Sequence, residues 1–398
     1  MKILMVNKFL YPNGGSETYI FELGKELVRQ GHEVEYFGME HENRIVGNHA
    51  ESYTSNMDFH TGKLQKLLYP FKIIYSSDAR KKIRAVLEDF KPDIVHLNNF
   101  NYQLTPSIIY EIKAHKIPIV FTAHDLQLVC PNHLMTYGLT GELCLRCLTK
   151  GSISCFQGRC IHGSRVKSLL GALENWLYKR LKPYKRIDVI ICPSCFVQEK
   201  LEMNPQLAGR TIVLRNFISN VENTGNTIEK KEYAVYFGRY STEKGVETLA
   251  AACRELSEIP FIFAGKGELT KIVDSVGNIQ NKGFLSGEEL HRLIAEARFS
   301  ISVSECPENC PFSVMESLKL GTPVIGAKIG GIPELIKDGE TGLLVESGNK
   351  EELKAAIRRL WENRDENSRY IQNCKNIAFD NCEEYCLKLV KIYEDITT

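Results

Sequence analysis

Two carboxylates eight residues apart, Glu308 and Glu316, are the first candidates for chemistry in this chain. Glu308 lies in a loop between Pro307 and Pro311, and Glu316 lies in the first turns of the helical pattern that follows. A carboxylate can accept hydrogen bonds from two hydroxyl groups at once. A carboxylate near a helix start also stabilises that helix by roughly 0.3–1 kcal/mol, so the spacing alone leaves a purely structural role open.

The apolar runs around these carboxylates predict how the chain presents them. Residues 299–303 predict a buried strand, 312–320 a helix and 323–327 a second strand. In parallel α/β sheets, ligands bind outside the carboxyl ends of the strands, where the amino ends of helices offer free backbone amides. The loop that holds Glu308 is therefore the expected centre of a site.

Glycine-bearing loops follow two more expected strands, at 233–237 and 261–264. They contain Gly238, Arg239, Lys244 and Gly265. Fixed cations stabilise negative charge that develops during a reaction, by several kcal/mol where water is excluded. The alternative for Arg239 and Lys244 is a pair of exposed surface charges.

The first half of the chain shows the same alternation. A strand at 2–6, a loop with Gly14 and Gly15, a helix at 18–30 and a strand at 33–37 form a βαβ unit. The loop has neither the G-x-G-x-x-G pattern of dinucleotide-binding folds nor the G-x-x-x-x-G-K-[ST] pattern of nucleoside-triphosphate loops. Adjacent glycines let a backbone approach a ligand closely, although a tight turn would use them too.

Three features of the first half each leave two interpretations open. His124 comes just after an expected strand at 119–122, which suits a site, although a lone histidine is more often structural. A helix expected at 166–184 combines basic and aromatic side chains, which is typical of a membrane interface or of a domain helix with its apolar face inside. Residues 40–90, basic and expected on helices, predict a solvated face or a contact with a membrane or polyanion.

The charge distribution favours an anionic partner for the first half. Up to Asn216 there are 28 Lys plus Arg against 20 Asp plus Glu, and after it 22 against 29, although the whole chain of 398 residues has a formal charge of only +1. The length predicts about two domains. No run approaches the ~18 apolar residues of a membrane span, and the first apolar run is too short for a signal peptide. We expect a cytoplasmic protein that touches a membrane peripherally at most, and no nucleic-acid partner.

The α/β alternation lapses between residues 130 and 165, where five cysteines gather. They are Cys130, Cys144, Cys147, Cys155 and Cys160. Disulfides are rare in the cytosol, so we interpret these residues as reduced thiols or metal ligands. Cys144 and Cys147 form a C-x-x-C pair, and Cys155 and Cys160 form a second pair with four residues between them. These four cysteines suit a structural zinc site, with Cys130 as a possible substitute ligand. A free-thiol or redox-sensitive loop is the alternative.

Six stretches, taken together and in this order, resemble the family 4 glycosyltransferases of the GT-B fold. They are YPNGGSETYIFELGKELVRQGHEVEYF, FTAHD, IICPS, YFGRYSTEKGVETLA, FAGKGEL and ENCPFSVMESLKLGTPVIGAKIGGIPELIKDGETGLLV. The resemblance covers nearly the whole chain and implies two Rossmann-like, doubly wound α/β domains that face a cleft. The acceptor-binding domain would be 1–219, with the cysteine-rich insertion and a last helix at about 381–398 packed back on it. A linker at 220–232 would lead to a nucleotide-sugar-binding domain at 233–380.

The resemblance also implies roles for the candidate residues. Arg239 and Lys244 would bind the donor diphosphate, Glu316 the ribose hydroxyls, and Glu308 the hydroxyls of the donor sugar. His124 would lie near that sugar, so that Glu308, Lys244, Arg239 and His124 form the catalytic set. The remaining donor-binding residues would be Gly14, Gly15, Gly238, Gly265, Asn309, Cys310, Phe312 and Ser313.

One position departs from the family pattern. Cys310 and Pro311 stand where glycine and phenylalanine are more usual. Proline has no N–H to donate, so one backbone contact to the donor is in doubt, and Phe312 is expected to begin the helix.

The implied reaction is a transfer from a UDP- or GDP-sugar to a glycan or lipid-linked glycan, with retention of anomeric configuration. In such a front-face displacement the departing phosphate oxygen helps deprotonate the acceptor, and the first half has no D-x-D triplet, so we expect catalysis without a metal. The setting would be cell-surface polysaccharide biosynthesis at the inner face of the membrane. The alternatives are a GT-B sugar-nucleotide epimerase or hydrolase, which would need an acid/base pair, and a non-catalytic sugar-nucleotide or glycan binder.

Overall fold

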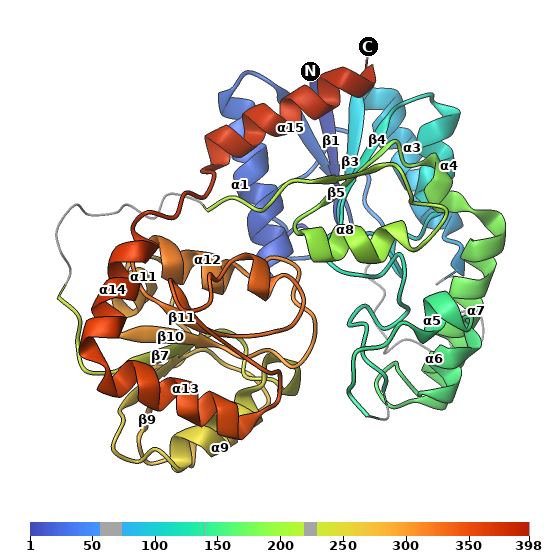
Figure 1. Ribbon diagram of the computed structural model, residues 1–398. Helices are drawn as coiled ribbons and strands as arrows, with labels where there is room; N and C mark the ends of the chain where they lie inside the picture. The colour runs from blue at the N-terminus through green and yellow to red at the C-terminus, as the bar shows by residue number, and fades with distance from the viewer. Residues whose placement is uncertain (56–73, 139, 219–228, 398) are drawn as a thin grey trace. The chain divides into compact units, whose positions relative to one another are not determined.

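The chain forms two compact units, which are described separately (Figure 1). The computed structural model describes residues 1–55, 74–138, 140–218 and 229–397. The first unit comprises Met1–Asn216 and Cys382–Thr398, and the second comprises Phe217–Asn381. Most of the expected linker, 220–232, lies outside the described residues.

The first unit is built on a six-stranded parallel sheet. Its strands, in spatial order, are β2 (Glu33–Phe37), β1 (Lys2–Val6), β3 (Ile94–Leu97), β4 (Ile119–Thr122), β5 (Val189–Cys192) and β6 (Thr211–Val213). The central strands β1, β3 and β4 are almost continuously apolar and buried, because helices cover both faces of the sheet. The helices are α1 (Gly15–Arg29), α3 (Ser77–Phe90), α4 (Ser107–Ala114), α5 (Arg146–Thr149), α6 (Ile153–Gln157), α7 (Arg165–Leu181), η1 (Pro183–Arg186), α8 (Cys195–Glu202) and α15 (Cys382–Thr397).

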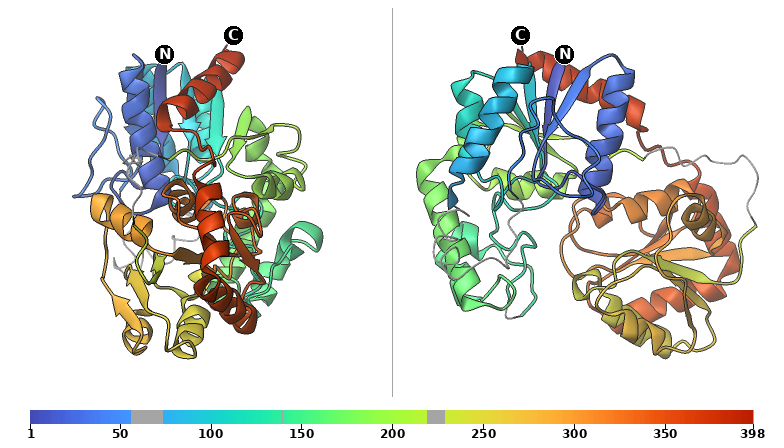
Figure 2. Two further views of the ribbon diagram at one scale, coloured as in Figure 1. Left: turned by 60° about the vertical axis from the view of Figure 1, so that its left-hand side comes forward. Right: turned by 180° about the vertical axis from the view of Figure 1, so that it is seen from behind.

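The last helix, α15, packs beside α1 in the first unit, although the second unit separates the two in sequence (Figures 1 and 2). The buried hydroxyl of Tyr385 lies 2.7 Å from that of Tyr19. The hydroxyl of Tyr393 lies 2.5 Å from Nδ1 of His96, on β3. Burial lowers the pKa of His96 to about 3, so its ring is neutral at physiological pH. A chain of buried polar contacts therefore fixes α15 to the sheet.

Removing one hydroxyl from this chain should destabilise the first unit. In Tyr393→Phe, the buried Nδ1 of His96 loses the partner described above, which costs about 1–3 kcal/mol. Urea unfolding followed by circular dichroism would measure the loss. The control is Tyr75→Phe, whose 44% exposed side chain can replace its lost contact with water. Equal stabilities of the two variants would show that the buried pair contributes nothing.

The second unit is built on another six-stranded parallel sheet. Its strands, in spatial order, are β12 (Gly342–Val345), β11 (Val324–Ala327), β10 (Phe299–Ser302), β7 (Ala234–Phe237), β8 (Phe261–Ala264) and β9 (Ile279–Asn281). Its helices are η2 (Thr242–Lys244), α9 (Val246–Arg254), α10 (Thr270–Asp274), α11 (Gly287–Glu296), α12 (Phe312–Lys319), η3 (Ile332–Glu334), α13 (Lys350–Glu362) and α14 (Arg364–Cys374). The carboxyl ends of the central strands β7 and β10 carry the two loops in which candidate residues were expected.

Two local expectations are met only in part. The sequence pattern from Gly330 to Glu334 predicts the start of a helix, but the structure forms only the short 3₁₀ turn η3 there. Among the described residues between 40 and 90, helix occurs from 74 onward and not in 40–55; Lys63, Lys66 and Lys72 lie outside the described residues.

Candidate functional site

Lys244 is positioned by a tight approach of two loops in the second unit. It ends the 3₁₀ turn η2 and is followed by Gly245, whose φ of +69° favours glycine. A Cβ at Gly245 would lie 2.0 Å from the carbonyl oxygen of Val303, just after β10. Only glycine therefore lets the loop after β7 reach the loop after β10.

Lys244 and Glu308 meet across these two loops. The Nζ of Lys244 donates to Oε1 of Glu308, and the Oγ of Ser304 donates to the same oxygen at 2.7 Å. Burial acts to raise the pKa of Glu308, but the charge and hydrogen bond of Lys244 outweigh it and hold the pKa below its usual value. The side chains remain 36% and 16% exposed, so this ionised pair is accessible to a ligand.

The backbone of Glu308 is held by the glycine pair after β11. The amide of Gly331 donates to the carbonyl oxygen of Glu308 at 2.7 Å. Gly330 has a φ of +62°, and a Cβ there would lie 2.3 Å from the same oxygen. Three segments that are distant in sequence therefore fix the position of one carboxylate.

Glu316 stands in contrast to Glu308, because it has no charged partner. Its side chain is half-buried on α12 and makes no hydrogen bond or ion pair to any residue that the structure describes. Burial raises its pKa to about 7. A half-buried carboxylate without a protein partner can accept hydrogen bonds from the hydroxyl groups of a ligand.

The amino end of α12 offers backbone amides beside these carboxylates. Phe312 begins the helix, as expected, and the carbonyl of Pro311 accepts from the amides of the third and fourth helical residues at 3.2 and 3.3 Å. The amides of Phe312 and Ser313 thus remain at the positive end of the helix. The thiol of Cys310 is buried and donates to the sulfur of Met315 at 3.4 Å. Cys310 can therefore serve a ligand only through its backbone, whereas the preceding Asn309 is half-buried.

Arg239 stands at the start of the same loop as Lys244. Gly238 and Gly265 cross here so closely that a Cβ at Gly265 would lie 1.9 Å from the carbonyl oxygen of Gly238. The backbone carbonyl of Arg239 accepts from the hydroxyl of Tyr236 at 2.9 Å, while its side chain is exposed. The Arg239 charge also contributes to the lowered pKa of Glu308. The second unit therefore gathers two cations, two carboxylates and a helix amino end.

In the first unit, His124 is held at the carboxyl end of the sheet. Its Nε2 lies 2.8 Å from Oδ1 of Asn98, just after β3, and its ring meets the Tyr19 ring edge-on with centroids 4.8 Å apart. Burial lowers its pKa to about 4, so the imidazole is neutral at physiological pH and its Nε2 is the donor to Asn98. A neutral histidine with one fixed ring nitrogen can orient a ligand.

The glycine pair begins α1 on a support of buried polar residues that sequence reasoning missed. Gly14 and Gly15 are exposed, and Gly14 precedes the first turn in an extended conformation. Below them, the buried Glu17 accepts from Nδ2 of Asn7 and from Oγ of Ser16, each at 3.0 Å. The signal was present in the sequence as asparagines directly after the strands β1 and β3.

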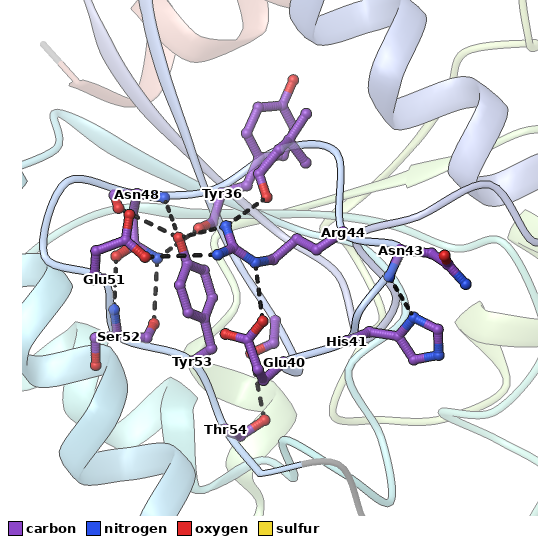
Figure 3. A network of polar contacts seen from close by, with 12 residues as sticks. Tyr36, Glu40, His41, Asn43, Arg44, Asn48, Glu51, Ser52, Tyr53 and Thr54 are labelled. Carbon is purple, nitrogen blue, oxygen red and sulfur yellow. Dashed lines mark hydrogen bonds and ion pairs between the residues drawn. The ribbon is translucent and has the colours of Figure 1, made fainter.

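A network of polar contacts orders the loop that follows β2 (Figure 3). The guanidinium of Arg44 lies over the ring of Tyr53, 3.9 Å from its centroid, and its Nε donates to Glu40 at 3.2 Å. The ring of His41 stacks on Tyr11 with centroids 4.0 Å apart, just before the glycine pair. The segment expected to be helical is therefore an ordered loop at the edge of the candidate site.

The five cysteines of the insertion line one small cavity in the first unit. Burial raises the pKa of Cys130 to about 12 and that of Cys147 to about 11, while the Cys155 thiol lowers the pKa of Cys160 to about 6. Among the described residues, however, no three His, Cys, Asp or Glu side chains are arranged so that they could hold a metal ion. The predicted zinc ligands Cys144, Cys147, Cys155 and Cys160, with Cys130 as the possible substitute, therefore share one cavity but are not arranged to hold a metal ion, and the zinc site stays a prediction.

Metal analysis of the purified chain would decide the zinc question. If the prediction is right, inductively coupled plasma mass spectrometry finds about one zinc per chain, and Cys144→Ser or Cys147→Ser lowers this value by more than half. The control is Cys195→Ser, an exposed cysteine outside the insertion. Zinc at background level in the unsubstituted chain would leave a free-thiol loop as the answer.

Comparison with known proteins gives consistent results for the two units. A family model described as Glycosyltransferase Family 4 matches residues 13–219, and one described as Glycosyl transferases group 1 matches residues 219–377. An uncharacterized glycosyltransferase of Methanocaldococcus jannaschii is 24% identical over 358 residues, which cover 87% of this chain and 96% of that protein.

Solved structures match the chain over almost its whole length. A sucrose-phosphate synthase from Thermosynechococcus elongatus has a TM-score of 0.70 at 17% identity and covers 99% of this chain and 98% of its own. HepE of Anabaena in complex with UDP-glucose has a TM-score of 0.65 at 17% identity and covers 99% of this chain and 100% of its own.

Proposed function

The chain belongs to the family 4 glycosyltransferases and has their GT-B fold, and from this premise we propose that it transfers a sugar from a nucleotide-diphosphate sugar with retention of anomeric configuration. The observation that supports this proposal is the contrast between the two carboxylates of the second unit. The ion pair with Lys244 keeps Glu308 ionised, whereas the Glu316 side chain has no hydrogen-bond or ion-pair partner among the described residues. In the proposed complex, the ribose hydroxyls of the nucleotide-sugar bind Glu316, and the hydroxyls of the transferred sugar bind Glu308.

The cations and amides of the second unit suit the diphosphate of such a donor. As the bond between the sugar C1 and the phosphate oxygen breaks, negative charge grows on the departing diphosphate. Arg239, Lys244 and the first amides of α12 stabilise that charge. The acceptor oxygen bonds to C1 on the same face of the sugar, and its proton passes to the departing phosphate oxygen. No metal enters this proposed scheme.

We further propose an acceptor that is a glycan or a lipid-linked glycan, in cell-surface polysaccharide biosynthesis at the inner face of the membrane. The first unit would bind it, with Gly14, Gly15 and the neutral His124 beside the transferred sugar. The excess of positive charge up to Asn216 supports an anionic acceptor such as a lipid diphosphate. Among the described residues, no helix is both long and apolar enough to cross a membrane.

A nucleotide panel tests the donor assignment. Thermal shift or calorimetry with UDP, GDP, ADP, CMP and their common sugars should show selective stabilisation by one nucleoside diphosphate, and brief chelation should leave it unchanged. Stabilisation by none of them would overturn the donor site. Turnover then separates the alternatives: an epimerase or hydrolase consumes the donor without an acceptor, whereas a non-catalytic binder leaves it intact.

A further inference from the structure

The helix α7 of the first unit exposes its apolar side. Its large apolar residues recur at helical spacing and are strongly solvent-exposed: Val166 70%, Leu169 40%, Leu173 46%, Trp176 52% and Leu181 55%. At 100° per residue these five positions fall within one face of the helix, here named the α7 face. The sequence left open whether this helix packs its apolar face inside, and in the structure it does not.

The orientation of α7 is fixed by contacts on its opposite side. That side is buried and carries small or polar residues: Ser168, Gly171, Ala172, Glu174 and Tyr178. The Oγ of Ser168 accepts from the amide of Ile161 at 3.0 Å, and a Cβ at Gly171 would lie 2.5 Å from the Ile161 side chain. The hydroxyl of Tyr178 donates to the carbonyl of Ile74 at 2.8 Å. Turning the apolar residues inward would break these contacts.

The exposed charges on α7 and directly after it have one sign. Arg165, Lys167 and Arg180 are exposed on the helix itself, and the exposed Lys182, Lys185 and Arg186 follow it directly. The Arg180 guanidinium lies 5.6 Å from the centroid of the Trp176 ring. The single acidic residue of α7, Glu174, is buried. The helix thus combines an apolar stripe with exposed cations and carries no exposed carboxylate of its own. This combination fits a partner surface that has an anionic outer layer over an apolar layer.

We propose that the α7 face docks on the surface of an anionic lipid bilayer. Trp176 and the leucines would enter the boundary between headgroups and acyl chains, while the rim of Lys and Arg would contact the headgroup phosphates. A second copy of this chain fits less well, because a symmetric contact through the same face would place the cationic rims against each other. The inference rests on the proposed function in one respect: if the acceptor is a lipid-linked glycan, docking through α7 brings the chain to the membrane that holds this acceptor.

Sedimentation with vesicles tests the docking on the full chain. Vesicles of phosphatidylcholine with phosphatidylglycerol should bind the chain, and vesicles of phosphatidylcholine alone should bind it far more weakly. The double variant Leu173→Ser, Trp176→Ser should bind the anionic vesicles on the order of tenfold or more weakly. Arg165→Gln should lose roughly fivefold at low salt, which corresponds to ~1 kcal/mol per charge. The matched control is Leu387→Ser, which removes a 60% exposed leucine from α15.

Fluorescence gives a second readout at the site itself. The chain has two tryptophans, so Trp361→Phe leaves Trp176 as the only one. Its emission should shift to the blue when anionic vesicles are added and stay unchanged without them. Absence of vesicle binding, or equal binding by the double variant and the control, would overturn the proposal. The proposal would also be overturned if sedimentation velocity showed that the unsubstituted chain forms a dimer and that the double variant does not.

The donor assignment can fail independently of this one. The double variant should keep the thermal shift produced by the preferred nucleoside diphosphate, because none of its substitutions touches the second unit. Vesicle binding without any nucleotide response would leave the α7 docking intact and overturn only the proposed function. A nucleotide response without vesicle binding would leave the donor assignment intact and overturn only the α7 docking.

Discussion

Lys244→Met should lower the turnover of the donor by about a hundredfold to a thousandfold, while the chain stays folded. In the structure the Lys244 ammonium lies against Glu308 at the carboxyl end of the second sheet. In the proposed reaction it also faces the diphosphate, on which charge grows only as the sugar departs. Losing such a cation raises the transition state more than the ground state, so kcat falls more than KM rises.

A matched lysine controls for the loss of an ion pair in the same unit. Lys231 donates to Glu296 at 2.6 Å, and its side chain is 55% exposed, so Lys231→Met should leave turnover within about twofold of the unsubstituted chain. Steady-state assays with the nucleotide-sugar identified by the panel would measure kcat and KM for both variants. Similar kcat values for Lys244→Met and Lys231→Met would show that Lys244 plays no part in catalysis.

Glu316→Gln should weaken donor binding while it stabilises the chain without ligand. A carboxylate that accepts from both ribose hydroxyls contributes about 1.5–3 kcal/mol per charged hydrogen bond, so the amide should raise the Kd roughly 10- to 100-fold. The pKa of Glu316 is raised from 4.5 to about 7 by burial. Affinity for a nucleotide-sugar should therefore increase as the pH rises through about 7, and Glu316→Gln should lack this increase.

The same pKa shift sets the sign of the stability effect. Because the folded state holds the proton more tightly than the unfolded state, the unfolding free energy should fall as the pH rises from about 4.5 to 7, by up to about 3 kcal/mol. Glu316→Gln should not show this fall and should be the more stable chain at pH 8. Denaturant unfolding at pH 5 and pH 8 would measure it, with the exposed Glu289→Gln as control. A Glu316 variant that is no more stable than this control at pH 8 would contradict the raised pKa.

The central strands could be predicted from the sequence because burial on both faces demands continuous apolar runs. The inner strands β1 and β4 have the expected bounds for this reason. The edge strand β9 has no matching prediction, because an edge strand is half-solvated and its Ile-Gln-Asn sequence carries little apolar signal. Strength of burial therefore decided which strands were predictable.

The candidate site was only partly predictable. Lys244 and Glu308 could be placed on loops that end neighbouring strands, but their ion pair depends on Gly245 and Gly330, which allow the loops to approach. The asparagines after β1 and β3 are visible in the sequence, but the pairings of Asn98 with His124 and of Asn7 with Glu17 depend on tertiary contacts that the sequence does not show. For α7 the spacing predicts an apolar face but not its direction, which Ser168 and Tyr178 determine through tertiary contacts.

The docking of α15 on the first unit has a consequence for folding during synthesis. All of Phe217–Asn381 leaves the ribosome before Tyr385 and Tyr393 can reach Tyr19 and His96. The second unit is continuous in sequence and can close its core while the first still exposes the surface that α15 covers. The domain that is translated first is therefore the last to be completed, and a nascent chain arrested after residue 381 should hold a protease-resistant second unit beside an unfinished first one.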